Sequence, residues 1–342
     1  MIDRPHTPAR TLARGLRRAV LALPICLTAA ALPDAVRAQA APAWPTKPVT
    51  IVAAYPPGGV ADQMARVMAT EFGKRWNQPV TVENRTGASG MIGANHVAKS
   101  APDGHVLLMA AMAEIVFTPY THEKMPYQPQ RDLTPVAMAV RYPFLLVANP
   151  AFPARTTADV IAAARKSPGE HTYATSGPGS VQHIAMEMFA RMAGVQLRHV
   201  PYKGVGPALM DVVGNQVSLM FAGFPPGMAQ VQAGKLTPIG VTTRERFKTA
   251  PDVPSIAETP GLERYDFPAW VALFAPAGTP PAVLDRLNRE AVEILATPSV
   301  RAGIEKAGMT TSAESRAELA AFMKSESDKY RKVIGDAGIR GE

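Results

Sequence analysis

The stretch Tyr55-Pro56-Pro57-Gly58-Gly59-Val60-Ala61-Asp62 has the residue types of a turn that can receive an anion. It follows an apolar run, residues 49–54, and leads into a segment whose apolar residues recur at helical spacing. The first turn of a helix has backbone N–H groups without an intrahelical partner, and its dipole favours negative charge. We therefore predict a lip for an anionic ligand, as opposed to a plain loop, formed by Tyr55, Pro56, Pro57, Gly58 and Gly59.

Asp62 lies in the first turn of that expected helix and has two interpretations. Its charge can simply complement the helix dipole. It can instead accept a hydrogen bond from a ligand amine, or hold the Pro/Gly turn in shape. The residue types alone leave both interpretations open, and Asp62 is included among the ligand-binding candidates.

A second glycine turn, residues 175–180, lies between a short strand pattern and another helical pattern. Its ligand-binding candidates are Thr175, Ser176, Gly177, Gly179, Ser180 and the nearby His183. Ser180 and His183 could be a nucleophile and its base. The alternative, which we favour, is that Ser180 caps the helix and His183 lies in its first turn.

Signatures of catalysis and metal binding are missing from the sequence. It has no G-x-S-x-G, H-E-x-x-H, P-loop or dinucleotide-binding fingerprint. The six histidines that follow residue 40 are scattered and show no paired-ligand spacing, and the single cysteine, Cys26, lies in the N-terminal segment. We predict a protein that is not an enzyme and holds no metal or cofactor. A secreted hydrolase using Ser180 or Ser89 is the competing hypothesis.

The elements that must position these turns alternate between strand and helix patterns. Strands are expected near residues 49–54, 79–82 and 105–111, with helices near 61–76 and 91–100 between them. This alternation is typical of a parallel sheet with crossover helices. Residues 112–135 are expected to form a loop, because they contain four prolines.

The same alternation begins again after residue 150, with expected strands at 173–175, 197–200, 217–221 and 239–242. Two such series, joined near 140–149 and 266–276, predict two α/β lobes. Ligands of open α/β sheets bind beyond the carboxyl ends of the strands, where both glycine turns are expected. The turns could therefore face each other across a cleft. Three C-terminal helices, near 282–296, 300–307 and 316–334, are expected to return to the first lobe.

The N-terminal forty residues have the pattern of a secretory signal. Arginines precede an apolar run that Pro24 interrupts, and Arg37-Ala38-Gln39-Ala40 contains an A-x-A site. We predict cleavage after Ala40, with Ala38 as the second choice, and export to the periplasm. Removing residues 1–40 takes away six Lys/Arg and two Asp, so the net charge falls from +8 to +4. No basic block remains, which argues against nucleic acid as a partner.

Several motifs in order resemble the Bug/TctC family, the periplasmic solute receptors of tripartite tricarboxylate transporters. They are Trp44-Pro45-x-Lys47-Pro48, the Tyr55–Asp62 turn, Glu83-Asn84-Arg85-x-Gly87-Ala88-x-Gly90, Pro102-Asp103-Gly104, the 173–183 segment, His199-Val200-Pro201-Tyr202-Lys203-Gly204 and Phe274-Ala275-Pro276-Ala277-Gly278-Thr279-Pro280. The resemblance implies a two-lobed periplasmic-binding-protein fold of type II-like architecture. Each lobe is then a mainly parallel sheet flanked by helices, and two hinge crossings join them. We expect lobe I to comprise residues 41–145 and 270–342, and lobe II residues 146–269.

The resemblance also implies that a ligand carboxylate is held by backbone N–H groups and waters at the two glycine turns. Two strand ends depart from the family pattern. Ala111-Met112 stands where the family often has a small polar residue and Asn, and Ala222-Gly223 where it often has Asp-Asn. Because both places should line the cleft, we expect Ala111, Met112, Ala222 and Gly223 to contact an apolar or aromatic carboxylate.

The partners implied by the resemblance are a small organic carboxylate and the membrane permease subunits of a tripartite tricarboxylate-type transporter. We expect the receptor itself to be a monomer. A receptor that presents its ligand to a sensor kinase is an alternative that sequence does not separate from transport.

Overall fold

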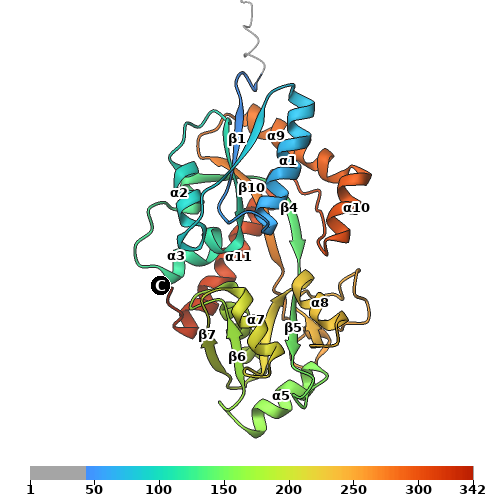
Figure 1. Cartoon of the computed structure of the whole chain (residues 1–342). Helices are drawn as coiled ribbons and strands as arrows, with labels where there is room; N and C mark the ends of the chain where they lie inside the picture. The colour runs from blue at the N-terminus through green and yellow to red at the C-terminus, as the bar shows by residue number, and fades with distance from the viewer. Residues whose placement is uncertain (1–43, 342) are drawn as a thin grey trace, which may run out of the picture. The chain divides into compact units, whose positions relative to one another are not determined.

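The computed structural model describes residues 44–341, and the predicted signal segment and its cleavage site lie outside this range. The described residues form two five-stranded sheets, each flanked by helices. In Figure 1, β1, β4 and β10 are grouped with α1 and α9, whereas β5, β6 and β7 are grouped with α5, α7 and α8. The two-lobed α/β fold expected from the sequence is confirmed.

The first sheet has the strand order β2-β1-β3-β10-β4. Its strands are β1 (Val49–Ala53), β2 (Val80–Asn84), β3 (Val106–Ala111), β4 (Leu133–Tyr142) and β10 (Ala269–Pro276). β1 pairs in parallel with β2 and β3, and β10 pairs antiparallel with both β3 and β4. The sheet is therefore mainly parallel with one reversed strand.

The second sheet has the order β7-β6-β8-β5-β9. Its strands are β5 (Phe144–Ala148), β6 (Thr172–Thr175), β7 (Arg198–Pro201), β8 (Leu219–Gly223) and β9 (Thr237–Val241). β6 pairs in parallel with β7 and β8, and β5 pairs antiparallel with β8 and β9. Only Pro143 separates β4 of the first sheet from β5 of the second, so the chain changes sheets within one residue.

Helices cover both faces of the sheets. The longer ones are α1 (Val60–Trp76), α2 (Met91–Ala98), α5 (Thr157–Lys166), α6 (Val181–Ala193), α7 (Val205–Val213), α8 (Phe224–Gln232), α9 (Pro281–Ala296), α10 (Pro298–Lys306) and α11 (Arg316–Ala337). Short helical pieces are η1 (Ala88–Gly90), η2 (Ala113–Phe117), α3 (Thr118–Thr121), α4 (Pro129–Asp132) and η3 (Ile256–Glu258).

Strands with both faces covered show continuous apolar runs. Ile51 of β1 packs into the cluster made with α1 and α9, and its neighbour Val52 packs into the cluster on the opposite face. The cluster that contains Val52 includes residues of both sheets and of α2, α6 and α11. α11 itself contacts β4 and η2 as well as α6, so it connects elements associated with both sheets.

Two expectations about local structure are wrong. The stretch 112–135 is not a loop: it contains η2, α3 and α4, and β4 begins at Leu133. α8 was not expected at all. α3, α4 and α8 each have proline at one of their first two positions, where its missing N–H costs no helical hydrogen bond. Here proline begins helices and does not prevent them.

Candidate functional site

The β1–α1 turn is held by Asp62, which is buried with an exposed fraction of 3%. Its carboxylate accepts the Gly58 N–H at 2.9 Å, the Asn84 side-chain amide at 2.9 Å and the Arg66 Nε–H at 3.0 Å. The hydrogen bond from Arg66 is the main cause that lowers the pKa of Asp62 to about 2. Of the interpretations of Asp62, this geometry supports the one in which it shapes the turn.

The rest of this turn is open to solvent. Pro56, Pro57, Gly58 and Gly59 are exposed, and Tyr55 is half-buried. Gly58 has φ +87°, a backbone conformation that glycine adopts without strain. The Gly58 N–H donates to Asp62, and the Gly59 N–H lies 3.4 Å from the Pro56 carbonyl oxygen, so the lip offers fewer free N–H groups than its sequence indicates.

The β2–α2 turn, residues 87–90, lies at the same edge of the first sheet and has an unusual backbone. All four of its residues have positive φ, including the non-glycine residues Ala88 (φ 47°) and Ser89 (φ 51°). Such conformations cost about 1 kcal/mol or more each and are concentrated at functional sites. The Tyr55 hydroxyl lies 3.4 Å from the Ser89 carbonyl oxygen, which links this turn to the first one.

Glu114 joins these turns and was not expected from the sequence. It is the second residue of η2, the π-helical segment after β3, and is completely buried. Its Oε1 accepts the Ala111 N–H at 2.8 Å, and its Oε2 lies 2.7 Å from the Tyr55 hydroxyl. Burial raises the pKa of Glu114 to about 8. An acidic residue within the apolar run Ala111–Phe117 is a sequence signal that could have identified it.

The second predicted turn, between β6 and α6, is held by neutral groups. The Thr175 hydroxyl is buried; it accepts the Gly177 N–H at 3.2 Å and lies 2.6 Å from His199 Nε2. The Gly179 N–H donates to His183 Nδ1 at 3.1 Å, which places the proton of a neutral His183 on Nε2. The structure thus brings together the predicted residues Thr175, Gly177, Gly179 and His183, and adds His199.

Three rings stack behind this turn. The centroids of His183 and His199 are 4.0 Å apart, and those of His199 and Tyr173 are 5.1 Å apart. Burial lowers the pKa of both imidazoles to about 4, with the neighbouring His183 as a further cause for His199. Both rings are therefore neutral at physiological pH. Tyr173 donates to Glu187 at 2.7 Å on the other side of the stack.

Ser180 acts as the N-cap of α6. Its hydroxyl oxygen accepts the backbone N–H of His183, so the pairing of Ser180 Oγ with the His183 ring that a nucleophile requires is not formed. The neighbouring Ser176 hydroxyl donates to the Gln182 side chain at 3.0 Å. These contacts favour the capping interpretation.

The four strand-end candidates lie at the expected ends of β3 and β8. Met112 and Ala222 are buried, each within a hydrophobic cluster, whereas Ala111 and Gly223 are partly exposed. Ala111 also joins the Tyr55 region through Glu114. Any contact of Met112 or Ala222 with a ligand stays a prediction.

The last described residues of the chain lie beside α3 and the β6–α6 turn. The Gly341 N–H donates to the Thr121 carbonyl oxygen at 2.9 Å. A Cβ at Gly179 would come within 3.1 Å of the Gly341 Cα. The segment after α11 therefore touches the β6–α6 turn and the end of α3.

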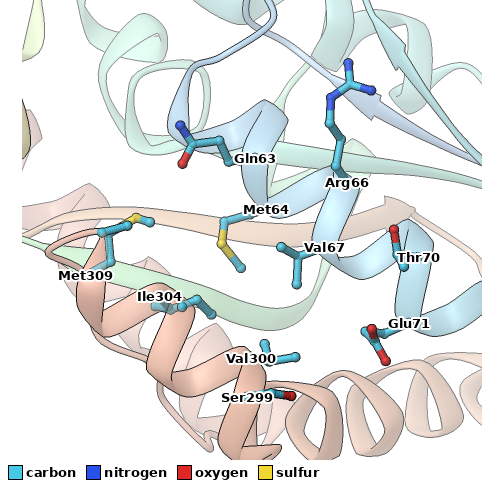
Figure 2. A pocket seen from close by; sticks show the side chains of 12 residues that line it. Gln63, Met64, Arg66, Val67, Thr70, Glu71, Ser299, Val300, Ile304 and Met309 are labelled. Atoms are coloured by element: carbon cyan, nitrogen blue, oxygen red, sulfur yellow. The ribbon is translucent and has the colours of Figure 1, made fainter.

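A groove of about 460 Å³ lies between α1 and α10 (Figure 2), and its lining includes Gln63 and Arg66, which hydrogen-bond to Gly58 and Asp62 of the first turn. Met64 and Val67 of α1 face Val300 and Ile304 of α10, and Arg66 points away from the groove. Its lining is mainly apolar, and none of the predicted ligand-binding residues belongs to it.

Within residues 44–341 no group of three or more His, Cys, Asp or Glu side chains is arranged to hold a metal ion. The helices in this part of the chain include none long and apolar enough to cross a membrane.

Comparison with known proteins gives a consistent result. Residues 64–339 match the family model described as tripartite tricarboxylate transporter family receptor. The chain is 34% identical over 320 residues to the UPF0065 protein in the tcbD-tcbE intergenic region of Pseudomonas sp. strain P51, covering 94% of each chain.

Two solved structures with named ligands are also similar. Rpa4515 of R. palustris with adipate has a TM-score of 0.77 and 32% identity, covering 87% of this chain and 99% of that one. MatC from Rhodopseudomonas palustris with bound malate has a TM-score of 0.72 and 30% identity, covering 85% and 99%. In each of those two structures the bound molecule is a carboxylate.

Proposed function

Because the chain belongs to the tripartite tricarboxylate transporter receptor family, we propose that it captures an organic carboxylate between its two glycine turns. The family is one of solute-binding receptors, and the family predicted from the motifs is confirmed. The observation that carries the proposal is the matched placement of the turns. Each turn follows a strand of a mainly parallel sheet and leads into a helix: the first lies between β1 and α1, and the second between β6 and α6. Helix N-termini of this kind receive anions.

The two turns would approach each other as lobes formed by residues 41–145 with 270–342 and by residues 146–269 close on the ligand. Backbone N–H groups of the Tyr55–Gly59 and Thr175–Ser180 turns would hold the carboxylate, with His183 Nε2–H as a further donor. Adipate and malate in the similar structures support a carboxylate ligand.

The remainder of the ligand is proposed to be apolar or aromatic. Ala111, Met112, Ala222 and Gly223 bring no hydrogen-bonding side chain to the two strand ends. A highly polar ligand such as citrate would lose hydrogen bonds to water there without replacing them.

Thermal denaturation with adipate, benzoate, citrate and glutamate tests the proposal. A ligand at a hundred times its Kd stabilises the folded chain by about 2.7 kcal/mol, enough to raise Tm by several degrees. We expect adipate or benzoate to raise Tm and citrate and glutamate to leave it unchanged. If citrate and glutamate raise Tm and adipate and benzoate do not, the proposed preference for an apolar ligand is wrong. If none of the four acids changes Tm and no carboxylate co-purifies with the protein, the proposal of a carboxylate ligand is wrong.

Delivery to a tripartite tricarboxylate-type permease, by a monomeric receptor exported to the periplasm, completes the proposal. Cells that lack the receptor should fail to accumulate the radiolabelled ligand. Unchanged uptake together with a lost transcriptional response would favour presentation to a sensor kinase instead.

A further inference from the structure

The Glu114 carboxyl is buried beside the first turn, where it contacts the hydroxyl of the half-buried Tyr55. Glu114 is 0% exposed, and no Lys, Arg or His of the described residues forms an ion pair with it. Burying an ionised carboxylate without a cation costs free energy, so such a group remains neutral over a wider pH range than an exposed one.

The hydrogen bonds around Glu114 fit a neutral acid. Oε1 accepts the Ala111 N–H, and Oε2 faces the Tyr55 hydroxyl at 2.7 Å. A carboxylic acid with its proton on Oε2 accepts through one oxygen and donates through the other. The same 2.7 Å contact fits an ionised Glu114 that accepts the Tyr55 proton. The two states differ in where the Tyr55 proton points.

Tyr55 has a second contact that makes this difference relevant to a ligand. Its hydroxyl lies 3.4 Å from the Ser89 carbonyl oxygen, a long and weak hydrogen bond. When Glu114 donates to Tyr55, the hydroxyl proton is free to leave Ser89 and to donate to an incoming carboxylate. When Glu114 is ionised, the proton points inward and Tyr55 presents only lone pairs, which repel an anion.

Other groups around Glu114 do not replace this function. Tyr127 donates to the Glu114 backbone carbonyl at 2.7 Å. The interaction of Tyr142 with the Glu114 carboxylate is electrostatic. Burial raises the pKa of both tyrosines, so they stay neutral. The β2–α2 turn contributes backbone only: a Cβ at Gly90 would come within 2.8 Å of the Glu114 carboxyl carbon.

We propose that Glu114 is a positioning residue which, by carrying a proton taken from solvent, turns the Tyr55 hydroxyl into a hydrogen-bond donor for the ligand carboxylate. The proposal rests on the proposed function. It implies that carboxylate affinity, measured from pH 6 upward, falls in alkali as Glu114 ionises near pH 8. Across this titration Kd should rise about tenfold, the effect of one lost hydrogen-bond donor.

Infrared difference spectroscopy tests the protonation without any ligand. We expect the wild-type chain to show a protonated carboxyl band that is lost on titration through about pH 8 and is missing in Glu114→Gln. A wild-type spectrum in which the Glu114 carboxyl is already ionised at pH 7 would overturn the proposal.

Affinity for adipate between pH 6 and pH 10 then tests the relay. Glu114→Gln keeps an amide donor to Tyr55, so its Kd should stay at the neutral-pH value of the wild type up to pH 10. Tyr55→Phe should bind about tenfold more weakly at pH 7, the effect of one lost hydrogen bond. Glu187→Gln is the matched control, because Glu187 accepts from Tyr173 in the other sheet region at the same 2.7 Å. It should keep the wild-type pH profile.

These outcomes distinguish a failure of the Glu114–Tyr55 relay from a failure of the proposed carboxylate binding. A wild-type Kd that stays flat to pH 10, or a Glu114→Gln variant that retains the alkaline loss, would overturn the relay and leave carboxylate capture intact. If no carboxylate binds the wild-type chain at pH 6, the proposed function fails, and the infrared titration still decides the ionisation of Glu114.

Discussion

The β1–α1 and β6–α6 turns occupy equivalent places in the two sheets but are stabilised by different chemistry. In the first turn, the ionised Asp62 accepts from the Gly58 N–H, Asn84 and Arg66. In the second, Thr175, His183 and His199 make the corresponding contacts without any charge. Both turns already use amides of their own, Gly58 in the first and Gly177 and Gly179 in the second, so the contrast lies in the charge: an ionised carboxylate behind the first turn opposes an incoming anion. We infer that the second turn is the stronger receiver of the ligand carboxylate.

A second contrast concerns two Tyr–Glu pairs. Tyr173 and Glu187 lie 2.7 Å apart behind the second turn, and Tyr55 and Glu114 lie 2.7 Å apart behind the first. Glu187 is half-buried, whereas Glu114 has no exposed surface. Complete burial is what supports the proton-dependent role proposed for the bond between Glu114 and Tyr55.

The largest effect is expected from Asp62→Ala. The change removes three hydrogen bonds to a buried charge, so the free energy of unfolding should fall by about 3 kcal/mol and adipate affinity by about tenfold or more. Urea denaturation and calorimetric titration measure the two effects.

Asp103→Ala is the matched control for this change. Asp103 accepts the His105 N–H at 3.0 Å in the turn before β3, at the opposite end of the strand from the site. It should lose stability and keep its affinity for adipate. Equal losses of affinity in both variants would show that Asp62 has no special role in the turn.

Thr175→Val tests the neutral scaffold of the second turn. It leaves the Gly177 N–H and His199 Nε2 without their partner, which should cost about 2 kcal/mol of stability and weaken adipate binding about tenfold. Thr172→Val, at the start of the same strand, removes the acceptor of the Ser218 N–H at 3.1 Å and is the control. If affinity survives Thr175→Val, the second turn is not a main anion receiver.

Ser180→Ala should have a smaller effect, about 1 kcal/mol, because it removes a helix cap and leaves the turn amides in place. Ser315→Ala removes the equivalent cap of α11, where the hydroxyl accepts the Glu318 N–H at 3.2 Å, and should cost a similar amount. Ester hydrolysis measured in parallel should be negligible in both variants and in the wild type. A turnover that Ser180→Ala abolishes would restore the hydrolase hypothesis.

Acid should loosen the two turns in a fixed order. Histidines whose pKa is lowered from 6.5 to about 4 contribute stability that is complete above pH 6.5 and is lost as pH falls towards 4. The contribution of Asp62, whose pKa is lowered from 3.8 to about 2, is lost only below pH 3.8. NMR signals of Gly177 and Gly179 should therefore shift before that of Gly58; the opposite order would contradict the charge contrast.

Much of the fold was predictable because its signals are local. Apolar runs and glycine turns located the strands of both sheets and the two turns, and Ser180 was correctly interpreted as a cap. Prolines misled the prediction: at the start of α3, α4 and α8 they initiate helices, and sequence alone does not distinguish that position from a break.

The partners of the site residues depend on contacts that are distant in sequence. Glu114 lies 59 residues from Tyr55, and His199 lies 24 residues from Thr175. No local sequence pattern predicts that these side chains are in contact, because their contact depends on how the crossover helices place the strands. The placement of the turns could be predicted, whereas the groups that hold each turn could not.

Identification of the small molecule that co-purifies with the mature chain from the periplasm tests the central claim most directly. Mass spectrometry of the wild type should find an organic carboxylate in an amount comparable to that of the protein, and the Asp62→Ala/Thr175→Val double variant should carry little or none. A wild-type chain that neither carries nor binds a carboxylate, or a double variant that retains it fully, would contradict capture between the two turns.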